Sequence, residues 1–462
     1  MRILFFFWIL LFLLGISGCN GGDGEEPVVS EAETAPPDTP SMSYDISLNS
    51  KSRVLNISTV NDQYPASLLL NLPGEVFSDP PPAKDRWIWT LVLELVAPIE
   101  ETWADFRALE REIVLGAERR AQLTLESTGG KEAYSVEVKP GNRRTHIYPH
   151  SALLPLEQVN FSGESEEGQV TIRSLQILLR YGTPLLPLPA DPGTVLAYNW
   201  EEWRDPDFEL FSWDLYPHIL VMDTADYSVQ DRFFKRLAFY VEKKGFRGNV
   251  FTLVELAGKH GYNAHDYRSE DLARYFNEVE TFPLTMEEER LKSILTENGV
   301  IIKKSSGYIP GMGGIISISR SSSEALRRHL LTHEIFHGVF FSRPSYREGC
   351  FAAWQELSPY QQEFWLLFLN WAGYATEDHF LVVNEFQAYL MQQPRREINY
   401  YFRELVPERL IKSYPQKEAH IRRILEAGKN GFSRSFDRLQ GLLQSKPAIK
   451  GGEVVTIKRQ RL

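Results

Sequence analysis

Two histidines and a glutamate stand close together in residues 330–341, which read LLTHEIFHGVFF. His333 and His337 are four positions apart, so on a helix their imidazoles lie one turn apart on the same face. Two histidines in that arrangement can hold one zinc ion, and Glu334 beside them can act as a general base toward water. With ten histidines and 61 acidic residues in the chain, about 0.03 such patterns are expected by chance. The segment therefore predicts a metal centre.

A capped helix is predicted to carry these residues. Ser321 and Glu324 have the S-x-x-E spacing of a capping box, so the helix is expected to begin at Ser322. It can continue to about Phe341, because Pro344 ends the pattern soon afterwards.

The motif His-Glu-x-x-His, with no charged residue at the flanking positions, resembles the zincin metallopeptidases. The resemblance implies a zincin-like fold, bound Zn²⁺ and hydrolysis of a protein or peptide substrate. It implies His333 and His337 as metal ligands and Glu334 as the catalytic residue. It also implies that an edge strand before the helix pairs with the substrate, and residues 314–319 are expected to be that strand. An internal strand with a flexible approach is the other interpretation of this segment. Three glycines at or just before the start of this strand would let another backbone approach closely: Gly311, Gly313 and Gly314.

The identity of the third metal ligand distinguishes the subclasses of zincin metallopeptidases. Metzincins continue the motif with a nearby third histidine, whereas the next histidine here is His379. Gluzincins take a glutamate from a later helix, and Glu385 lies in the apolar helical segment 380–391, FLVVNEFQAYLM. A carboxylate there is costly unless it is paired or bound to a cation. The run EFQAY also resembles the ligand helix of gluzincins related to anthrax lethal factor, so Glu385 is the favoured ligand.

Glu348 is the alternative third ligand. The pair Glu-Gly at 348–349 resembles the ligand segment of aminopeptidase-like gluzincins, although only ten residues separate Glu348 from His337. A salt bridge to Arg343 or Arg347 is the other interpretation of this carboxylate.

Peptide hydrolysis also needs a donor for the oxyanion of the tetrahedral intermediate. Three residues near the Glu385 segment could supply it, although none stands at the spacing of the resembled families: Tyr374, His379 and Tyr389.

The N-terminus resembles a bacterial lipoprotein signal peptide over residues 1–18. An apolar run of about twelve residues follows Met1-Arg2 and is too short to span a bilayer. Ile16-Ser-Gly precedes Cys19, and the resemblance implies cleavage there and lipidation of Cys19, which would anchor the chain to the membrane of the bacterial cell envelope. Residues 19–43 are rich in Gly, Glu and Pro and predict a disordered tether. Cys350 is the only other cysteine, so no disulfide is expected.

The rest of the chain predicts an α+β protein of two domains. Residues 44–181 alternate like strands, apart from a helix-like stretch at 101–121, and predict a β-sandwich. Its end, VNF followed by 162–181, resembles the last strands of jelly-roll modules found in carbohydrate-binding proteins, which implies contact with a glycan. A structural or spacer domain is the other interpretation. Residues 182–200 contain four prolines and predict a linker.

Beyond the linker, residues 201–431 predict a zincin-like catalytic domain whose strands come first and whose helices come later. Residues 432–462 form a basic C-terminal tail without an assigned role.

Charge narrows the possible functions. The formal charge of −11 argues against nucleic acid as a partner, because phosphate binding needs a basic surface. The favoured hypothesis is a lipid-anchored zinc metallopeptidase of gluzincin type. The alternatives are an envelope surface-binding protein or adhesin with a structural or vestigial zinc site, and a hydrolase of an ester or amide bond in a cell-wall glycan.

Overall fold

The structure is a computed structural model. It describes residues 42–49, 52–59, 65–72, 87–97, 101–103, 113–115, 119–139, 141–153, 155–165, 168–428, 431–443 and 449–460. The signal peptide expected at 1–18, Cys19 and nearly all of the tether expected at 19–43 lie outside these residues. Within them, no helix combines the length and the apolar character that crossing a membrane requires.

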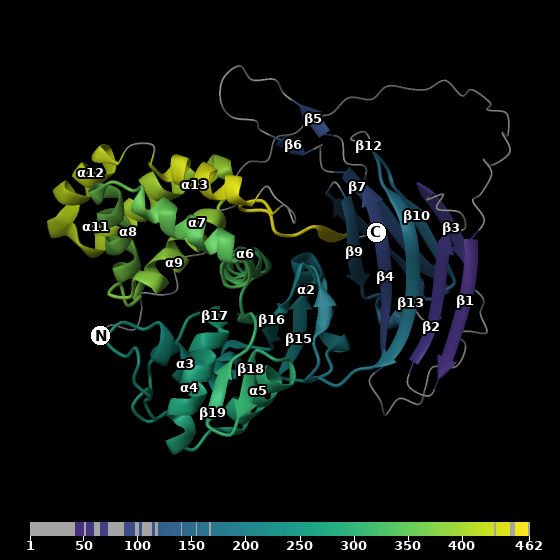
Figure 1. Ribbon diagram of the computed structural model, residues 1–462, viewed down its shortest axis with the longest axis horizontal. Coiled ribbons are helices and arrows are strands. Elements are labelled where there is room, and N and C mark those ends of the chain that lie inside the picture. The colour runs from purple at the N-terminus through teal and green to yellow at the C-terminus, as the bar shows by residue number, and fades with distance from the viewer. Residues whose placement is uncertain are drawn as a thin grey trace.

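Two five-stranded antiparallel sheets form the N-terminal domain (Figure 1). The first has the order β1 (Met42–Asn49), β2 (Ser52–Thr59), β13 (Thr171–Tyr181), β4 (Trp87–Ala97) and β9 (Gly141–Ile147). The second has the order β21 (Ile457–Gln460), β8 (Gly130–Val138), β7 (Arg119–Ser127), β10 (Gln158–Ser162) and β3 (Ser67–Asn71).

These sheets have jelly-roll topology. In chain order, β2, β4, β9 and β13 build one sheet, while β3, β7, β8 and β10 build the other. Strands such as β7 alternate buried and exposed side chains, because only one face of each sheet meets the core. Leucines of β4 and β7 meet in one apolar cluster between the sheets, so the expected sandwich is confirmed.

Four short strands lie beside the main sheets. β5 (Glu101–Trp103) pairs with β6 (Ile113–Leu115), and β11 (Glu164–Ser165) pairs with β12 (Gly168–Gln169). The helix-like interpretation of 101–121 is therefore wrong for 101–103, 113–115 and 119–121, which are strands, and the rest of that stretch lies outside the described residues.

A third five-stranded sheet centres the C-terminal α+β domain. Its order is β14 (Leu188–Ala190), β15 (Phe208–Trp213), β16 (Tyr216–Thr224), β20 (Gly314–Ser319) and β17 (His265–Arg268). β16 and β20 are parallel, and β17 runs antiparallel to β20 at the edge. The strand expected at 314–319 is present, but it is internal, so it cannot pair with a substrate.

The glycines of this region let the chain's own backbone approach closely. A Cβ at Gly314 would lie 2.4 Å from the Tyr267 carbonyl oxygen in β17, and one at Gly313 would lie 2.0 Å from the His218 carbonyl oxygen. Gly313 also has a φ of +77°, a conformation that favours glycine. The close approach expected of a substrate is thus made by the neighbouring strands.

Helices cover both faces of this sheet. One face carries α3 (Tyr227–Val241), α4 (Ser269–Glu278) and α5 (Met286–Glu297), which share an apolar cluster with Leu220 and Met222. The other face carries α6 (Glu324–Ser342), which shares a cluster with Val221 and Ile316 and with α7 (Pro344–Gln355), α8 (Pro359–Ala372) and α9 (His379–Met391). The hairpin of β18 (Ile301–Lys304) and β19 (Gly307–Pro310) and the helices α10 (Ile398–Tyr400), α11 (Val406–Ser413) and α12 (Glu418–Ala427) complete the domain.

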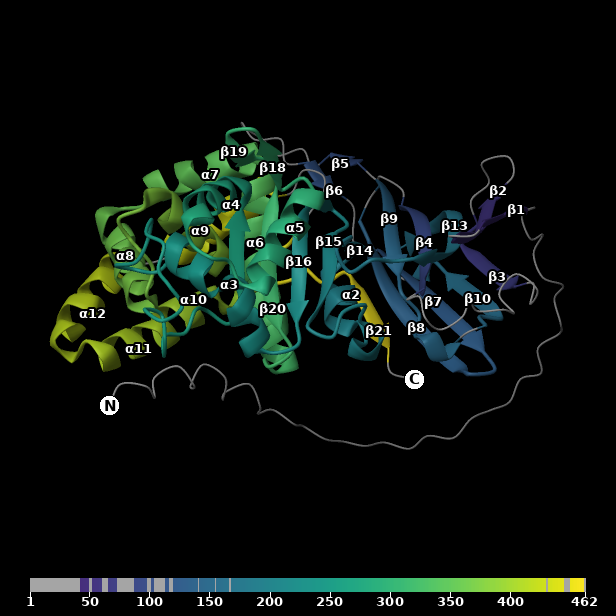
Figure 2. The same cartoon turned by 90° about the horizontal axis from the view of Figure 1, so that it is seen from below.

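The expected linker and tail are both structured. Residues 182–200 contain β14, which pairs with β15, and α2 (Pro192–Ala197), so they belong to the α+β domain. In the tail, α13 (Gly431–Leu442) packs on α7 and α9, and β21 then joins the jelly roll beside β8 (Figure 2). The chain therefore crosses between the domains twice.

Asp191 joins these two crossings. Its Oδ1 accepts hydrogen bonds from the backbone N–H groups of Gly193, Thr456 and Ile457 at 2.8, 3.1 and 3.1 Å. Arg143 of the jelly roll donates to its Oδ2 at 3.2 Å. One buried carboxylate thus links the jelly roll, α2 and the C-terminal strand.

Candidate metal centre

Helix α6 positions both histidines and Glu334. Its N-cap is Ser323, whose side chain accepts from the Leu326 N–H, so the helix starts two residues later than the Ser321 capping box predicts. Gly338 lets this helix approach the sheet, because a Cβ there would lie 3.1 Å from the Ile219 Cγ2 in β16. The close approach buries the face that carries His333, Glu334 and His337.

Helix α9 positions Glu385. Asp378 caps its start by accepting from the N–H groups of Phe380 and Leu381. Gln387 fixes α9 against α6, because its Nε2 donates to the Phe336 carbonyl at 3.2 Å. Glu385 consequently faces α6 and is only 1% exposed.

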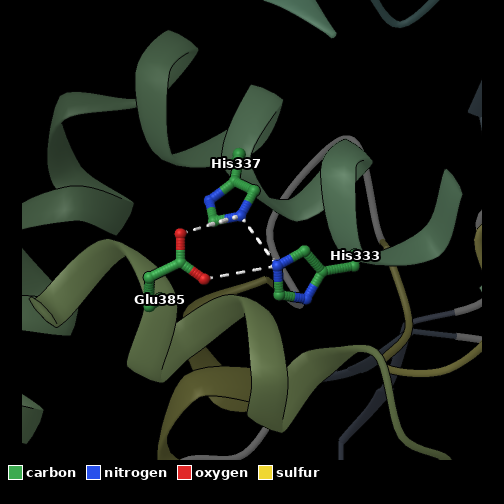
Figure 3. Close-up of side chains that lie close together, drawn as sticks. All are labelled: His333, His337 and Glu385. Carbon is green, nitrogen blue, oxygen red and sulfur yellow. Dashed lines mark hydrogen bonds and ion pairs between the residues drawn. The ribbon is translucent and has the colours of Figure 1, made fainter. Parts of the chain in front are cut away.

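The three predicted ligands point toward one another (Figure 3). The Nε2 atoms of His333 and His337 are 3.0 Å apart. Glu385 Oε2 lies 3.4 Å from His333 Nε2, and its Oε1 lies 3.7 Å from His337 Nε2. Donors around a tetrahedral zinc, with bonds of about 2.0–2.1 Å, stand about 3.3 Å from each other. The two imidazoles and the carboxylate therefore match the donor set and the spacing of one zinc site.

A hydrogen bond from the far side orients His333. Its Nδ1 lies 2.9 Å from the Gln392 Oε1 at the end of α9. Because that oxygen accepts, the proton is on Nδ1 and the Nε2 lone pair faces the centre. Gln392 thus prepares His333 as a ligand.

Burial holds both histidines in the neutral form that a metal requires. It lowers the pKa of His333 to about 4 and the pKa of His337 well below its usual value. Burial also raises the pKa of Glu385 to about 8, an effect that a hydrogen bond with Tyr374 reduces.

Glu334 adds a second uncompensated carboxylate to the centre. Burial and the nearby Glu385 raise its pKa well above the usual value. Glu334 Oε2 and Glu385 Oε2 have no hydrogen-bond partner in the described part of the chain. Two buried carboxylates without a basic partner suit a bound cation.

Sequence reasoning missed two carboxylates at this centre. Asp266 of β17 lies with its Oδ1 3.5 Å from His337 Nε2, and Asn384 Nδ2 donates to its Oδ2 at 3.2 Å. Glu242, directly after α3, is 3% exposed and raises the pKa of Glu334 further. Both come from segments far from the motif, and the only signal for Asp266 is an acidic residue in a short buried strand.

The alternative ligand Glu348 lies away from the centre. It is exposed on α7, and neither group of potential metal ligands among the described residues contains it.

Of the three candidate oxyanion donors, the two tyrosines lie at the centre and His379 does not. Tyr374 is hydrogen-bonded to Glu385, and the Tyr389 ring lies 4.6 Å from the His333 ring. His379 is exposed at the start of α9, with its ring 5.5 Å from that of Phe351, so it is not part of the centre.

Residues 242–264 pack against the chain at Tyr374 and Ala375. The backbone of Lys243 pairs with that of Tyr374, and the Ala375 N–H donates to the Glu242 carbonyl at 3.1 Å. Tyr262 stacks on Tyr374, with 5.1 Å between the ring centroids. We call this segment the roof (residues 242–264); none of the three ligands is more than 6% exposed.

Comparisons of the chain with models of protein families, with curated proteins and with solved structures find no match.

Proposed function

We propose that this protein is a zinc-dependent metallopeptidase of gluzincin type, anchored by a lipid on Cys19 in the bacterial cell envelope. The observation that carries the proposal is the meeting of His333 Nε2, His337 Nε2 and the Glu385 carboxylate within 3.0–3.7 Å of one another. Neutral imidazoles and a buried carboxylate are a donor set that Zn²⁺ prefers.

Each residue of the centre then has a role. His333, His337 and Glu385 would hold Zn²⁺, which supplies Lewis acidity toward a substrate carbonyl and water when it is bound. Glu334 would accept the proton of the attacking water and pass it to the leaving amine. A nearby cation favours the ionised carboxylate, which offsets the effect of burial on the Glu334 pKa.

Tyr374 is the favoured donor for the developing oxyanion, because it already reaches the Glu385 carboxylate. Tyr389 packs against His333 and would keep that ring in place. Neither tyrosine shares the exposure of His379, which lies outside the centre.

A peptide substrate would bind at the edge of the sheet next to this centre. Among the described residues β17 pairs only with β20, so β17, and not the strand at 314–319, is the edge strand nearest the centre. An extended peptide can add to such an edge through backbone hydrogen bonds. The roof at 242–264 would have to move for a substrate to enter, and the jelly roll would hold the domain near an envelope polymer.

Zinc content and hydrolysis of a mixed peptide library test the proposal on the chain from residue 20 onward. Glu334→Gln is expected to keep one zinc per chain and to lose hydrolysis by about 10²–10⁴-fold, the usual contribution of a general base. Glu385→Ala is expected to lose both zinc and hydrolysis. Glu348→Ala, which removes an exposed glutamate, is the matched control and should keep both. Wild-type protein without bound zinc, or a Glu334→Gln variant with full activity, would overturn the proposal.

The depth of the centre favours one second candidate, a surface-binding protein with a structural zinc. His337 is 0% exposed and Glu385 1% exposed, which is the burial of a structural site. This candidate predicts one tightly held zinc in the wild type, no hydrolysis of any peptide and unchanged binding of envelope glycans in Glu334→Gln.

A further inference from the structure

A second set of donors overlaps the predicted zinc site. Asp266, Glu334 and His337 offer ligand atoms that all lie within 4.8 Å of one another. Each of these side chains is at least nine-tenths buried, and Glu334 Oε2 has no hydrogen-bond partner in the described part of the chain. This set draws on β17, whereas the zinc site draws on α6 and α9 alone.

The register of β17 points Asp266 into the centre. Asp266 is paired with Ile316 of β20, between His265 and Tyr267. The rings of His265 and Tyr267 pack on Phe234 of α3, at 5.5 and 6.0 Å. Since side chains alternate along a strand, Asp266 lies on the opposite face of the sheet, beneath α6. Asn384 holds its Oδ2, which leaves Oδ1 facing His337.

The two donor sets share one atom. His337 Nε2 lies 3.5 Å from Asp266 Oδ1 and 3.7 Å from Glu385 Oε1. One imidazole nitrogen has one lone pair and coordinates one ion. Occupation of the two positions through His337 is therefore mutually exclusive.

The donor chemistry of the two positions differs. His333, His337 and Glu385 provide two nitrogens and one carboxylate, a set suited to zinc. Asp266, Glu334 and His337 provide one nitrogen and two carboxylates, and oxygen-rich sites suit harder cations such as Mn²⁺.

We propose that Asp266, Glu334 and His337 form a second metal position for a hard divalent cation, and that this position excludes zinc from the His333–His337–Glu385 site. An ion there engages Glu334, so the centre is inactive in this state; this consequence rests on the proposed peptidase function. Zinc then activates the centre by taking His337 and releasing Glu334. The second position is thus a resting state of the same centre.

Binding of manganese(II) alone and zinc alone to the metal-free full chain tests this position without any activity measurement. Free Mn²⁺ is followed by its electron paramagnetic resonance signal, and zinc by competition with a chelating dye. Asp266→Asn is expected to weaken Mn²⁺ binding by at least about tenfold, as much as the loss of an outer-shell contact costs. The same variant should keep zinc binding within about threefold, and that retention reports that it is folded.

His333→Ala should give the reverse result, with weakened zinc binding and unchanged Mn²⁺ binding, and His337→Ala should weaken both. Zinc added to the Mn²⁺-loaded wild type should release the Mn²⁺ one for one. Glu348→Gln is the control for loss of a carboxylate elsewhere.

Three outcomes would overturn the second position: no Mn²⁺ binding by the wild type, equal losses of both metals in Asp266→Asn, or simultaneous binding of one Mn²⁺ and one zinc. These outcomes leave the peptidase proposal intact. Conversely, the expected metal selectivity in a protein that cleaves no peptide would keep the second position and reject the peptidase.

Discussion

The buried carboxylates near the start and near the middle of helix α6 differ in whether they have a basic partner. At the start, Arg327 donates two hydrogen bonds to Asp223 of β16 at 2.7 and 2.9 Å, and Arg320 adds a third at 2.9 Å. Two turns further on, Glu334 and the neighbouring Glu385 of α9 are also buried, and no arginine or lysine of the described residues lies beside them. Arginines of the chain compensate Asp223, and we call Asp223, Arg320 and Arg327 the closed cluster. Glu334 and Glu385 lack such partners among the described residues, and we call them the open cluster.

The difference lies in how each buried carboxylate is compensated. Removing a carboxylate from water is costly, and a well-formed arginine pair compensates for it within the folded chain. The open cluster has no such compensation among the described residues, so a metal-free fold keeps it at a cost in stability. A bound cation, as we propose, would supply the missing compensation beside the two neutral imidazoles.

The largest expected effect concerns the closed cluster. Asp223→Asn leaves Arg327 and Arg320 without their carboxylate, and it should lower the unfolding free energy by about 3–5 kcal/mol. Glu334→Gln in the metal-free protein removes an uncompensated charge of the same size, and it should leave that free energy unchanged or higher. Urea denaturation of both chelator-treated variants measures the contrast. Equal destabilisation by the two substitutions would mean that Glu334 has a partner in the fold, and the distinction between the clusters would fail.

Local patterns in the sequence predicted much of this centre. The four-residue spacing placed His333 and His337 on one helical face, and the apolar surroundings of Glu385 marked it as a carboxylate in need of a cation. Both features can be recognised from the sequence because helix periodicity depends only on residues that are close together along the chain. The α+β class followed from the same kind of evidence, since strand alternation fills the first part of the chain and helical periodicity the last.

Contacts between distant segments could not be predicted in this way. Asp266 reaches the centre only because β17 pairs with β20, with His265 opposite Ser317. The tail joins the jelly roll through the pairing of Ile457 with Val136, more than three hundred residues away. Neither of these strand registers can be derived from the spacing of residues in the sequence. The N-cap at Ser323 shows a smaller limit, because three consecutive serines give three possible starts and packing selects one.

A smaller effect is expected at the hydrogen bond that orients the open cluster. Gln392→Ala removes the acceptor for His333 Nδ1, so the ring can rotate and its tautomer is no longer fixed. Zinc affinity should fall about 10–100-fold, while the stability of the metal-free protein changes little. Gln393→Ala is the matched control, because Gln393 is also buried and its side-chain nitrogen has no partner among the described residues. Equal zinc affinities in the two variants would show that Gln392 does not position the ligand.

The smallest effect is a pH dependence to which Glu385 of the open cluster should contribute. Burial raises the Glu385 pKa from 4.5 to about 8, so between these values the folded metal-free protein binds a proton that the unfolded chain lacks. Glu385 should therefore lower the stability of the metal-free protein as the pH rises from about 7.5 to 8.5, by at most about 1.4 kcal/mol per pH unit. His333 opposes this trend near pH 6.5, because its pKa is lowered to about 4 while the unfolded histidine is still about half protonated there, but little of that opposition remains above about pH 7.5.

Zinc binding replaces that proton, so the zinc-loaded protein should lack this decline. The difference in melting temperature between zinc-loaded and chelator-treated protein should consequently widen from pH 7.5 to pH 8.5. Glu385→Gln has no carboxylate to titrate and should lose this part of the decline and of the zinc effect. A metal-free wild type whose stability follows the same pH dependence as Glu385→Gln over this range would show that Glu385 is already ionised and compensated within the fold. In that case the middle of α6 would be as closed as its start, and the reason to expect a cation there would be lost.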